Sequence, residues 1–218
     1  EVAMPVPKEP GKLVLEYDRH HHIHPYTVFD NSTGEGRLLV GAGSGTRIYD
    51  DEGNGYVDTA GGMWCTNVGL GNKEMAQAIA DQVQQLAYLS PFADMANAPA
   101  AKLAAKIAEL APGDMNHVFY TTGGSTAVDA AFRLVHFYQN CRDLRDKVHV
   151  ISRVDAYHGS TYAAVSLGGK PGDHPSDFNF ITDIIHHVKS PNFYRNGGDA
   201  TEEEFADQLF ADFEAKVE

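Results

Sequence analysis

The sequence has few cysteines, a deficit of basic residues and no apolar run long enough to span a membrane. Its two cysteines, Cys65 and Cys141, are too few and too far apart for a disulfide framework or a cysteine-rich zinc site, which favours a reducing compartment. The 17 basic residues are scattered among 30 acidic ones, and the net charge of -13 argues against general binding of nucleic acid or of a membrane surface. Because the first residues also lack a signal-peptide pattern, we expect a cytoplasmic protein.

The remaining composition is that of an ordinary globular chain. With 218 residues, 43% hydrophobic and 22% charged, it can form one substantial domain or parts of two. Residues 1–35 contain proline, glycine and a histidine cluster, which predicts an irregular arm. Short strands are predicted at residues 37–40, 46–49 and 56–58, separated by the turn-rich stretches GAGSG and DDEGNG. This pattern indicates a small meander.

Three segments have helical signals. The first covers residues 73–86, and the second begins at the cap residue Asn97 and ends near residues 111–113. The third begins at Thr201, which forms a capping box with Glu204, and continues to the last residues. The apolar face of the first helix comprises Met75, Ile79, Val83 and Leu86.

A pair of glycines separates a predicted strand from a predicted helix. Residues 117–122 are β-branched and aromatic, and helical spacing begins at Ser125, which caps or begins the first turn. Gly123 and Gly124 would let an anion approach the free N–H groups at the positive end of the helix dipole. The alternative is that the glycines only make a tight turn.

A second strand follows that helix, at residues 147–152. A helix that joins two strands favours a parallel α/β sheet. We expect an arm and small-domain meander over residues 1–70 and the first part of a large domain over residues 71–218. The rhythm of strands and helices calls for a further strand after the last helix, so the sheet is expected to be incomplete.

Four stretches together resemble the class III, fold-type I, pyridoxal-phosphate (PLP)-dependent aminotransferases, in particular the ω-amino acid or amine:pyruvate transaminase branch. They are HHIHPYT at 21–27, GGMWCTNVGLG at 61–71, FYTTGGSTAVDAAFRL at 119–134 and DAYHGSTYAAVSLGG at 155–169. The resemblance implies an α/β fold with a small N-terminal region and a large domain with a mixed, mainly parallel sheet.

The same resemblance implies a PLP site. Gly123, Gly124 and Ser125 would hold the phosphate, and Tyr157 would stack on the pyridine ring. His158 belongs to the same Tyr-His-Gly motif, with a structural, hydrogen-bonded imidazole as the preferred alternative.

Aromatic and apolar residues of the resembling motifs imply a substrate pocket. The candidates are Tyr26, Met63, Trp64 and Phe92, some of them contributed by the partner in a homodimer with a shared active site. Ordinary interface packing is the alternative for each of them.

Asp129 and the histidines of the arm are polar residues for which we expect a structural role, not a catalytic or metal-binding one. Asp129 follows the glycine corner, and we expect it to be non-catalytic, for example paired with Arg133 one turn on. The histidines of the arm, at positions 20, 21, 22 and 24, have no cysteine or carboxylate set at ligand spacing, so no metal site is expected.

The chemistry of transamination requires a lysine that forms a Schiff base with PLP and a carboxylate that keeps the pyridine nitrogen protonated. The resemblance implies that both lie beyond Glu218, so no catalytic residue is nominated here and this chain alone is expected to be inactive.

We therefore expect the N-terminal portion of a transaminase that moves an amino group from an ω-amino acid or primary amine to pyruvate or a similar keto acid. The alternatives are a complex in which a separate polypeptide supplies the remainder, a non-catalytic phosphate- or PLP-binding fragment, and a class III aminomutase or decarboxylase.

Overall fold

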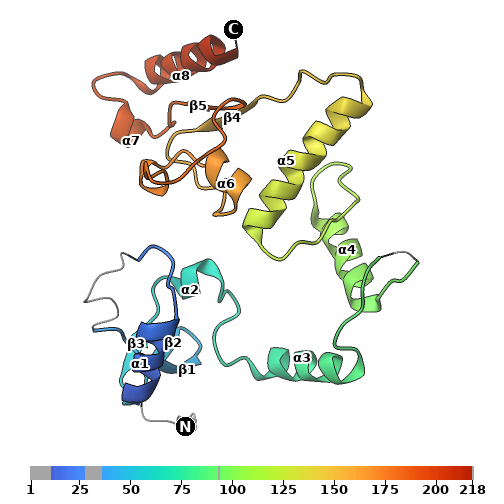
Figure 1. Cartoon of the computed structure of the whole chain (residues 1–218), viewed down its shortest axis with the longest axis vertical. Helices are drawn as coiled ribbons and strands as arrows, with labels where there is room; N and C mark the ends of the chain where they lie inside the picture. Colours follow the sequence, from blue (N-terminus) through green and yellow to red (C-terminus); the bar gives the residue numbers. More distant parts are fainter. Residues whose placement is uncertain (1–10, 28–35, 93, 218) are drawn as a thin grey trace. The chain divides into compact units, whose positions relative to one another are not determined.

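The chain divides into two compact units. The computed structural model describes residues 11–27, 36–92 and 94–217 (Figure 1). The units are Glu1–Ala101 and Lys102–Glu218, and the boundary lies within helix α4 (Ala98–Leu110). This division rests on contacts within the chain, whereas the boundary at residue 70 concerns the family's domain organisation and stays a prediction.

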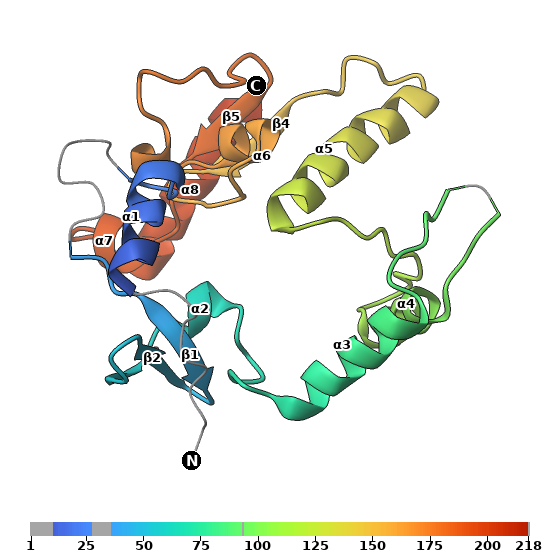
Figure 2. The same ribbon diagram turned by 60° about the horizontal axis from the view of Figure 1, so that its bottom comes forward.

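The first unit contains an antiparallel meander of strands β1 (Val40–Ser44), β2 (Arg47–Asp50) and β3 (Gly55–Val57), in that order. Figure 2 shows β1 beside β2. The meander was predicted, but its first strand is shifted: β1 runs through the GAGSG stretch that was assigned to a turn. Packing explains the shift, because a Cβ on Gly43 would lie 2.6 Å from the Leu70 side chain. Close approach of a neighbour, rather than chain reversal, requires a small residue there.

Helix α1 (Gly11–His21) corrects the prediction of an irregular arm. Arg19 lies in its last turn, where a cationic side chain interacts favourably with the negative end of the helix dipole. Residues 22–27 of the arm are irregular, as predicted, and residues 1–10 and 28–35 lie outside the described residues.

Helix α3 (Lys73–Gln85) and helix α4 form where the sequence predicts them. Asn72 accepts a hydrogen bond from the Met75 N–H at 2.9 Å, and Asn97 accepts one from the Ala100 N–H at 2.9 Å. Side-chain caps of this kind satisfy N–H groups that the helix leaves free. The short helix α2 (Gly61–Trp64) precedes them.

The second unit is built on a parallel strand pair, β4 (Val150–Arg153) and β5 (Ile185–Val188). Helix α5 (Gly124–Cys141) precedes β4, and helix α6 (Tyr162–Leu167) lies in the crossover between the two strands. The remaining elements are η1 (Pro171–Asp173), α7 (Phe193–Asn196) and α8 (Glu202–Val217).

A parallel sheet was predicted from strands at residues 117–122 and 147–152. The strand at 117–122 is not among the strands of the described chain, and β4 pairs instead with β5, which the sequence analysis did not predict. A strand forms through ladder hydrogen bonds to a neighbour, and β propensity alone does not supply that neighbour. The parallel crossover is therefore β4–α6–β5, with α5 outside it.

The described core is formed by residues of α6, β5 and α8. Its buried apolar residues are Ala164, Leu167, Ile185, Val188 and Phe205. Helix α8 begins with the predicted capping box: the Thr201 N–H donates to Glu204 at 2.8 Å, and the Glu204 N–H donates to Thr201 at 3.2 Å. Among the described helices, none combines the length and the apolar character that crossing a bilayer requires.

Candidate cofactor site

The start of α5 leaves backbone donors unused by the helix. Gly123 is its N-cap, and the helical hydrogen bond that reaches back to this residue joins the Ala127 N–H to the Gly123 carbonyl at 3.0 Å. The N–H groups of Gly124, Ser125 and Thr126 precede it and have no helical acceptor. Ser125 lies inside the first turn rather than at the cap.

The space above this helix start is open. A Cβ added to Gly123 or to Gly124 would meet nothing within 4 Å. Thr121 and Thr126 both donate side-chain hydrogen bonds to the Gly123 carbonyl, at 3.0 and 2.9 Å, and so fix the turn. An open set of N–H donors at the positive end of an 18-residue helix has the chemistry that binds a phosphate group.

The segment that follows Tyr157 is tied to the same helix start. The Ser160 N–H donates to Ser125 Oγ at 3.0 Å, and Thr161 Oγ1 donates to the Ser125 carbonyl at 3.3 Å. One turn further along α5, Asp129 Oδ1 accepts from the Ala164 N–H at 2.9 Å. Ser125 uses only its acceptor in the contact with Ser160, so its hydroxyl proton stays available for an anion.

Gly159 allows this approach. A Cβ at this position would lie 2.7 Å from Ser125 Cα and 2.5 Å from Ser125 Oγ, and the glycine has a φ of +136°. Both the contact distance and the backbone conformation exclude larger residues. The Tyr-His-Gly motif is therefore packed directly against the start of α5.

Tyr157 and His158 face different environments. The Tyr157 side chain is 60% exposed in the loop after β4, close to the carboxyl end of a parallel strand, where α/β sheets bind ligands. His158 Nε2 lies 3.1 Å from Ser152 Oγ on β4. That contact agrees with a structural, hydrogen-bonded role for the His158 imidazole. The exposed ring of Tyr157 is accessible to a cofactor.

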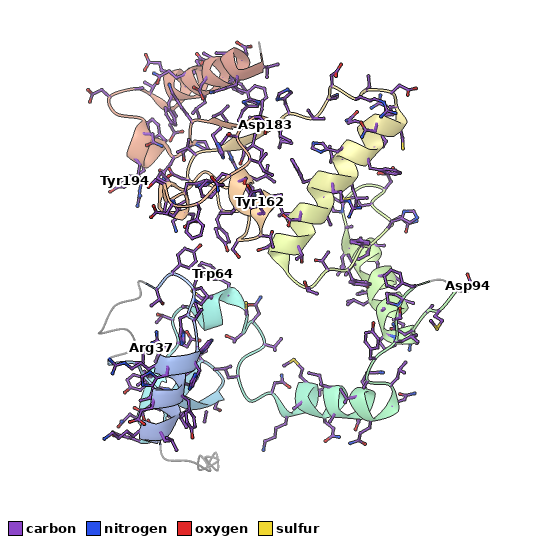
Figure 3. All side chains as sticks on the ribbon, viewed as in Figure 1. Arg37, Trp64, Asp94, Tyr162, Asp183 and Tyr194 are labelled. Carbon is purple, nitrogen blue, oxygen red and sulfur yellow. The ribbon has the colours of Figure 1, made fainter. Side chains whose placement is uncertain are left out.

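The predicted substrate residues Tyr26, Met63, Trp64 and Phe92 belong to the first unit, and the five cofactor candidates belong to the second. The four substrate candidates are exposed, Trp64 by 79% and Phe92 by 80%. Figure 3 labels the Trp64 side chain. Met63 and Trp64 have φ values of 55° and 66°, in the left-handed region. Backbone strain of this kind concentrates at ligand-binding segments.

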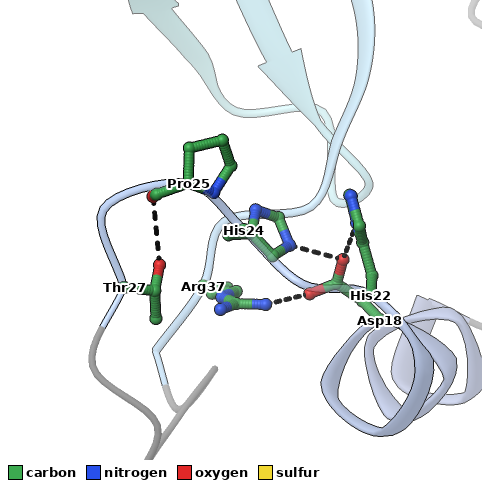
Figure 4. Close-up of polar contacts among 6 residues, drawn as sticks. All are labelled: Asp18, His22, His24, Pro25, Thr27 and Arg37. Atoms are coloured by element: carbon green, nitrogen blue, oxygen red, sulfur yellow. Dashed lines mark hydrogen bonds and ion pairs between the residues drawn. The ribbon is translucent and has the colours of Figure 1, made fainter. Parts of the chain in front are cut away.

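Asp18 is the polar residue that the sequence reading missed (Figure 4). Its carboxylate contacts His22 Nδ1 at 2.9 Å, His24 Nε2 at 2.8 Å and the guanidinium of Arg37. Hydrogen bonds from His24, Arg37 and His22, in that order, hold the pKa of Asp18 well below its usual value. The prediction that no carboxylate lies at ligand spacing from the histidines was wrong. The sequence feature that could have indicated the contact is the spacing of Asp18 and His22, one helical turn apart.

This cluster has the residue types of a metal site, since its three ligand atoms lie within 4.8 Å of one another. The Asp18 carboxylate, however, already receives a guanidinium and two imidazoles, and the guanidinium offsets its charge. The described contacts are those of a hydrogen-bonded hub that joins the end of α1 to the residues before β1.

The parallel β4–α6–β5 unit, the open start of α5 and the loop packed against it belong to an α/β fold of fold type I. The Aminotransferase class-III family matches residues 29–218. The chain therefore belongs to the class III aminotransferases, whose cofactor is PLP.

Two comparisons place the chain within that family. It is 38% identical to the putrescine–pyruvate aminotransferase of Pseudomonas aeruginosa over 91% of this chain and 43% of the relative. The crystal structure of an (S)-enantioselective omega-transaminase from Thermomicrobium roseum superposes with a TM-score of 0.89 at 32% identity, over 96% of this chain and 46% of that one.

An omega-transaminase of Pseudomonas jessenii, solved in complex with PMP, gives a TM-score of 0.89 at 34% identity over 94% of this chain and 45% of that structure. The chain thus spans less than half the length of the relatives that it matches.

Proposed function

We propose that this chain is the cofactor-cradling portion of a PLP-dependent ω-transaminase. The observation that carries the proposal is the open start of α5, with the Tyr157 loop packed against it, in a chain of the class III family. When bound, PLP supplies an electron sink for bonds at the substrate carbon that carries the amino group.

The residues of this chain bind and orient that cofactor. The N–H groups of Gly124 and Ser125 and the Ser125 hydroxyl donate to the phosphate, and the helix dipole stabilises its charge. The exposed ring of Tyr157 stacks on the pyridine, and His158 is held by its contact with Ser152 on β4.

The proposed reaction moves an amino group from a primary amine or ω-amino acid to pyruvate or a similar keto acid. The relatives support this class, because one is a putrescine–pyruvate aminotransferase and others are omega-transaminases. We assign Tyr26, Met63, Trp64 and Phe92 to the apolar walls around the amine, with a homodimer as the assembly in which they meet the cofactor. The proton-transferring lysine is proposed to lie beyond Glu218, and a cytoplasmic location goes with this assignment.

The test uses the full-length protein with Gly124→Asp. Aspartate at the first position of a helix is compatible with folding, because it interacts favourably with the dipole. It nevertheless fills the open space and repels the phosphate, so the dissociation constant for PLP should rise at least about tenfold. The matched control is Gly172→Asp, at another glycine where a Cβ meets nothing within 4 Å.

Fluorescence titration with PLP measures the binding, and alanine formation from putrescine and pyruvate measures the activity. Equal PLP affinity of Gly124→Asp and Gly172→Asp would contradict the assigned seat. Wild-type PLP binding without amino transfer to any keto acid would instead favour an aminomutase, a decarboxylase or a non-catalytic fragment.

A further inference from the structure

Asp129 reaches from α5 to a different helix. Its Oδ1 accepts from the Ala164 N–H at 2.9 Å, and Ala164 is the third residue of α6. Thr161, the N-cap of α6, makes no side-chain cap hydrogen bond of its own. A carboxylate from the neighbouring helix therefore supplies the acceptor that the start of α6 lacks.

We use the word latch for the hydrogen bonds that join Ser125 and Asp129 of α5 to residues 160–164. Ser125 Oγ accepts from the Ser160 N–H, and the Ser125 carbonyl accepts from the Thr161 hydroxyl. Ser125 and Asp129 lie one turn apart on α5, so together they fix the segment from Ser160 to Ala164 in position and in direction.

The latch holds Tyr157 through a short, constrained connection. Only His158 and Gly159 separate the ring-bearing residue from Ser160, and His158 is anchored to Ser152. Gly159 rests on Ser125 at a distance that leaves no room for a Cβ. Ala164 itself is fully buried, so this side of the loop has little freedom to move.

We propose that Asp129 is a positioning residue for the cofactor: by capping α6 it sets the place of the Tyr157 ring relative to the phosphate seat. The proposal rests on the proposed function and goes beyond it, since the described side-chain hydrogen bond of Asp129 runs to Ala164 and not to the phosphate-binding residues or to the Tyr157 ring. It also replaces the predicted pairing with Arg133, because the described hydrogen bond of Asp129 runs to Ala164.

The test is a double-mutant cycle in the full-length protein, with the dissociation constant for PLP as the readout. Asp129→Ala removes a charge-assisted hydrogen bond and should weaken PLP binding about tenfold. If Asp129 acts through Tyr157, the same substitution in a Tyr157→Ala background should cost less than about twofold. Equal losses in both backgrounds would show a general structural effect and overturn the proposal.

Two further variants complete the design. Asp129→Asn keeps an acceptor oxygen for the Ala164 N–H and should bind PLP within about threefold of the wild type. Asp207→Ala, at an exposed aspartate of α8, should bind PLP like the wild type. A full loss of affinity in Asp129→Asn would contradict a role as acceptor.

Where Asp129→Ala does not fold, the cycle uses Asp129→Ser, whose shorter side chain stops short of the Ala164 N–H. Absence of PLP binding by the wild-type protein overturns the proposed function and this proposal with it. If the wild-type protein binds PLP but the losses of affinity from Asp129→Ala and Tyr157→Ala are additive, the proposed role of Asp129 is overturned and the proposed function stands.

Discussion

Tyr157 is the residue whose chemistry depends most on what is bound beside it. Its ring is 60% exposed in the described chain, so replacing it removes little packing within the chain itself. Tyr157→Ala should weaken PLP binding at least about tenfold through lost ring stacking, whereas Tyr157→Phe keeps the ring and the affinity. Unchanged PLP occupancy of Tyr157→Ala at limiting cofactor would remove the ring from the site.

Asp18 gives a prediction that is independent of the cofactor. Hydrogen bonds from His24, Arg37 and His22 lower its pKa in the folded protein. Because the folded-state pKa lies below that of the unfolded chain, the stabilisation is fully present above about pH 4 and is lost as pH falls through the folded-state pKa.

An NMR titration of ¹³C-labelled aspartate carboxyls measures this directly, with Asp18→Asn to assign the resonance. The midpoint should lie below that of an ordinary aspartate, and Arg37→Gln should raise it. A midpoint at the ordinary value would show that the hub does not persist in solution.

Between elements, the contact of the Tyr157 loop with α5 depends on one glycine. Gly159→Ala places a methyl group against Ser125 and forces a φ of +136° on alanine, a strain of about 1–3 kcal/mol. We expect a lower melting temperature and weaker PLP binding. Gly172→Ala is the matched control, since a Cβ there meets nothing within 4 Å, and identical behaviour of the two variants would contradict the packing argument.

Elements with local signals could be predicted from the sequence. The caps at Asn97 and Thr201 and the apolar period of α3 predict helices, because these signals depend on residues within one or two turns. The strand expected at 117–122 and the position of β1 depended on neighbours distant in sequence, which no local pattern specifies.

In the candidate site, too, contacts between residues distant in sequence could not be predicted. The glycine corner and Tyr157 could be found from their motifs, and their packing through Gly159 could not. Likewise, Asp129 was predicted to pair within its own helix, whereas its described partner is 35 residues away in the chain.

The molecule as a whole exposes many large apolar side chains. Phe119 is 73% exposed, Phe137 is 65% exposed, and the predicted apolar face of α3 is uncovered. Exposed apolar area of this extent marks interaction surfaces. The remainder of a full-length aminotransferase and a second subunit are the proposed covers.

Produced alone, the 218-residue chain should therefore bind a hydrophobic dye and self-associate. Dye fluorescence and sedimentation measure both properties, and the full-length protein serves as the control. A monomeric 218-residue chain that melts cooperatively without binding dye would contradict this account.

The most direct test of the central claim is a crystal structure of the full-length protein with PLP. The account predicts phosphate oxygens within about 3 Å of the Gly124 and Ser125 N–H groups, with the Tyr157 ring stacked on the pyridine. A phosphate bound elsewhere, with the start of α5 left to solvent, would contradict it.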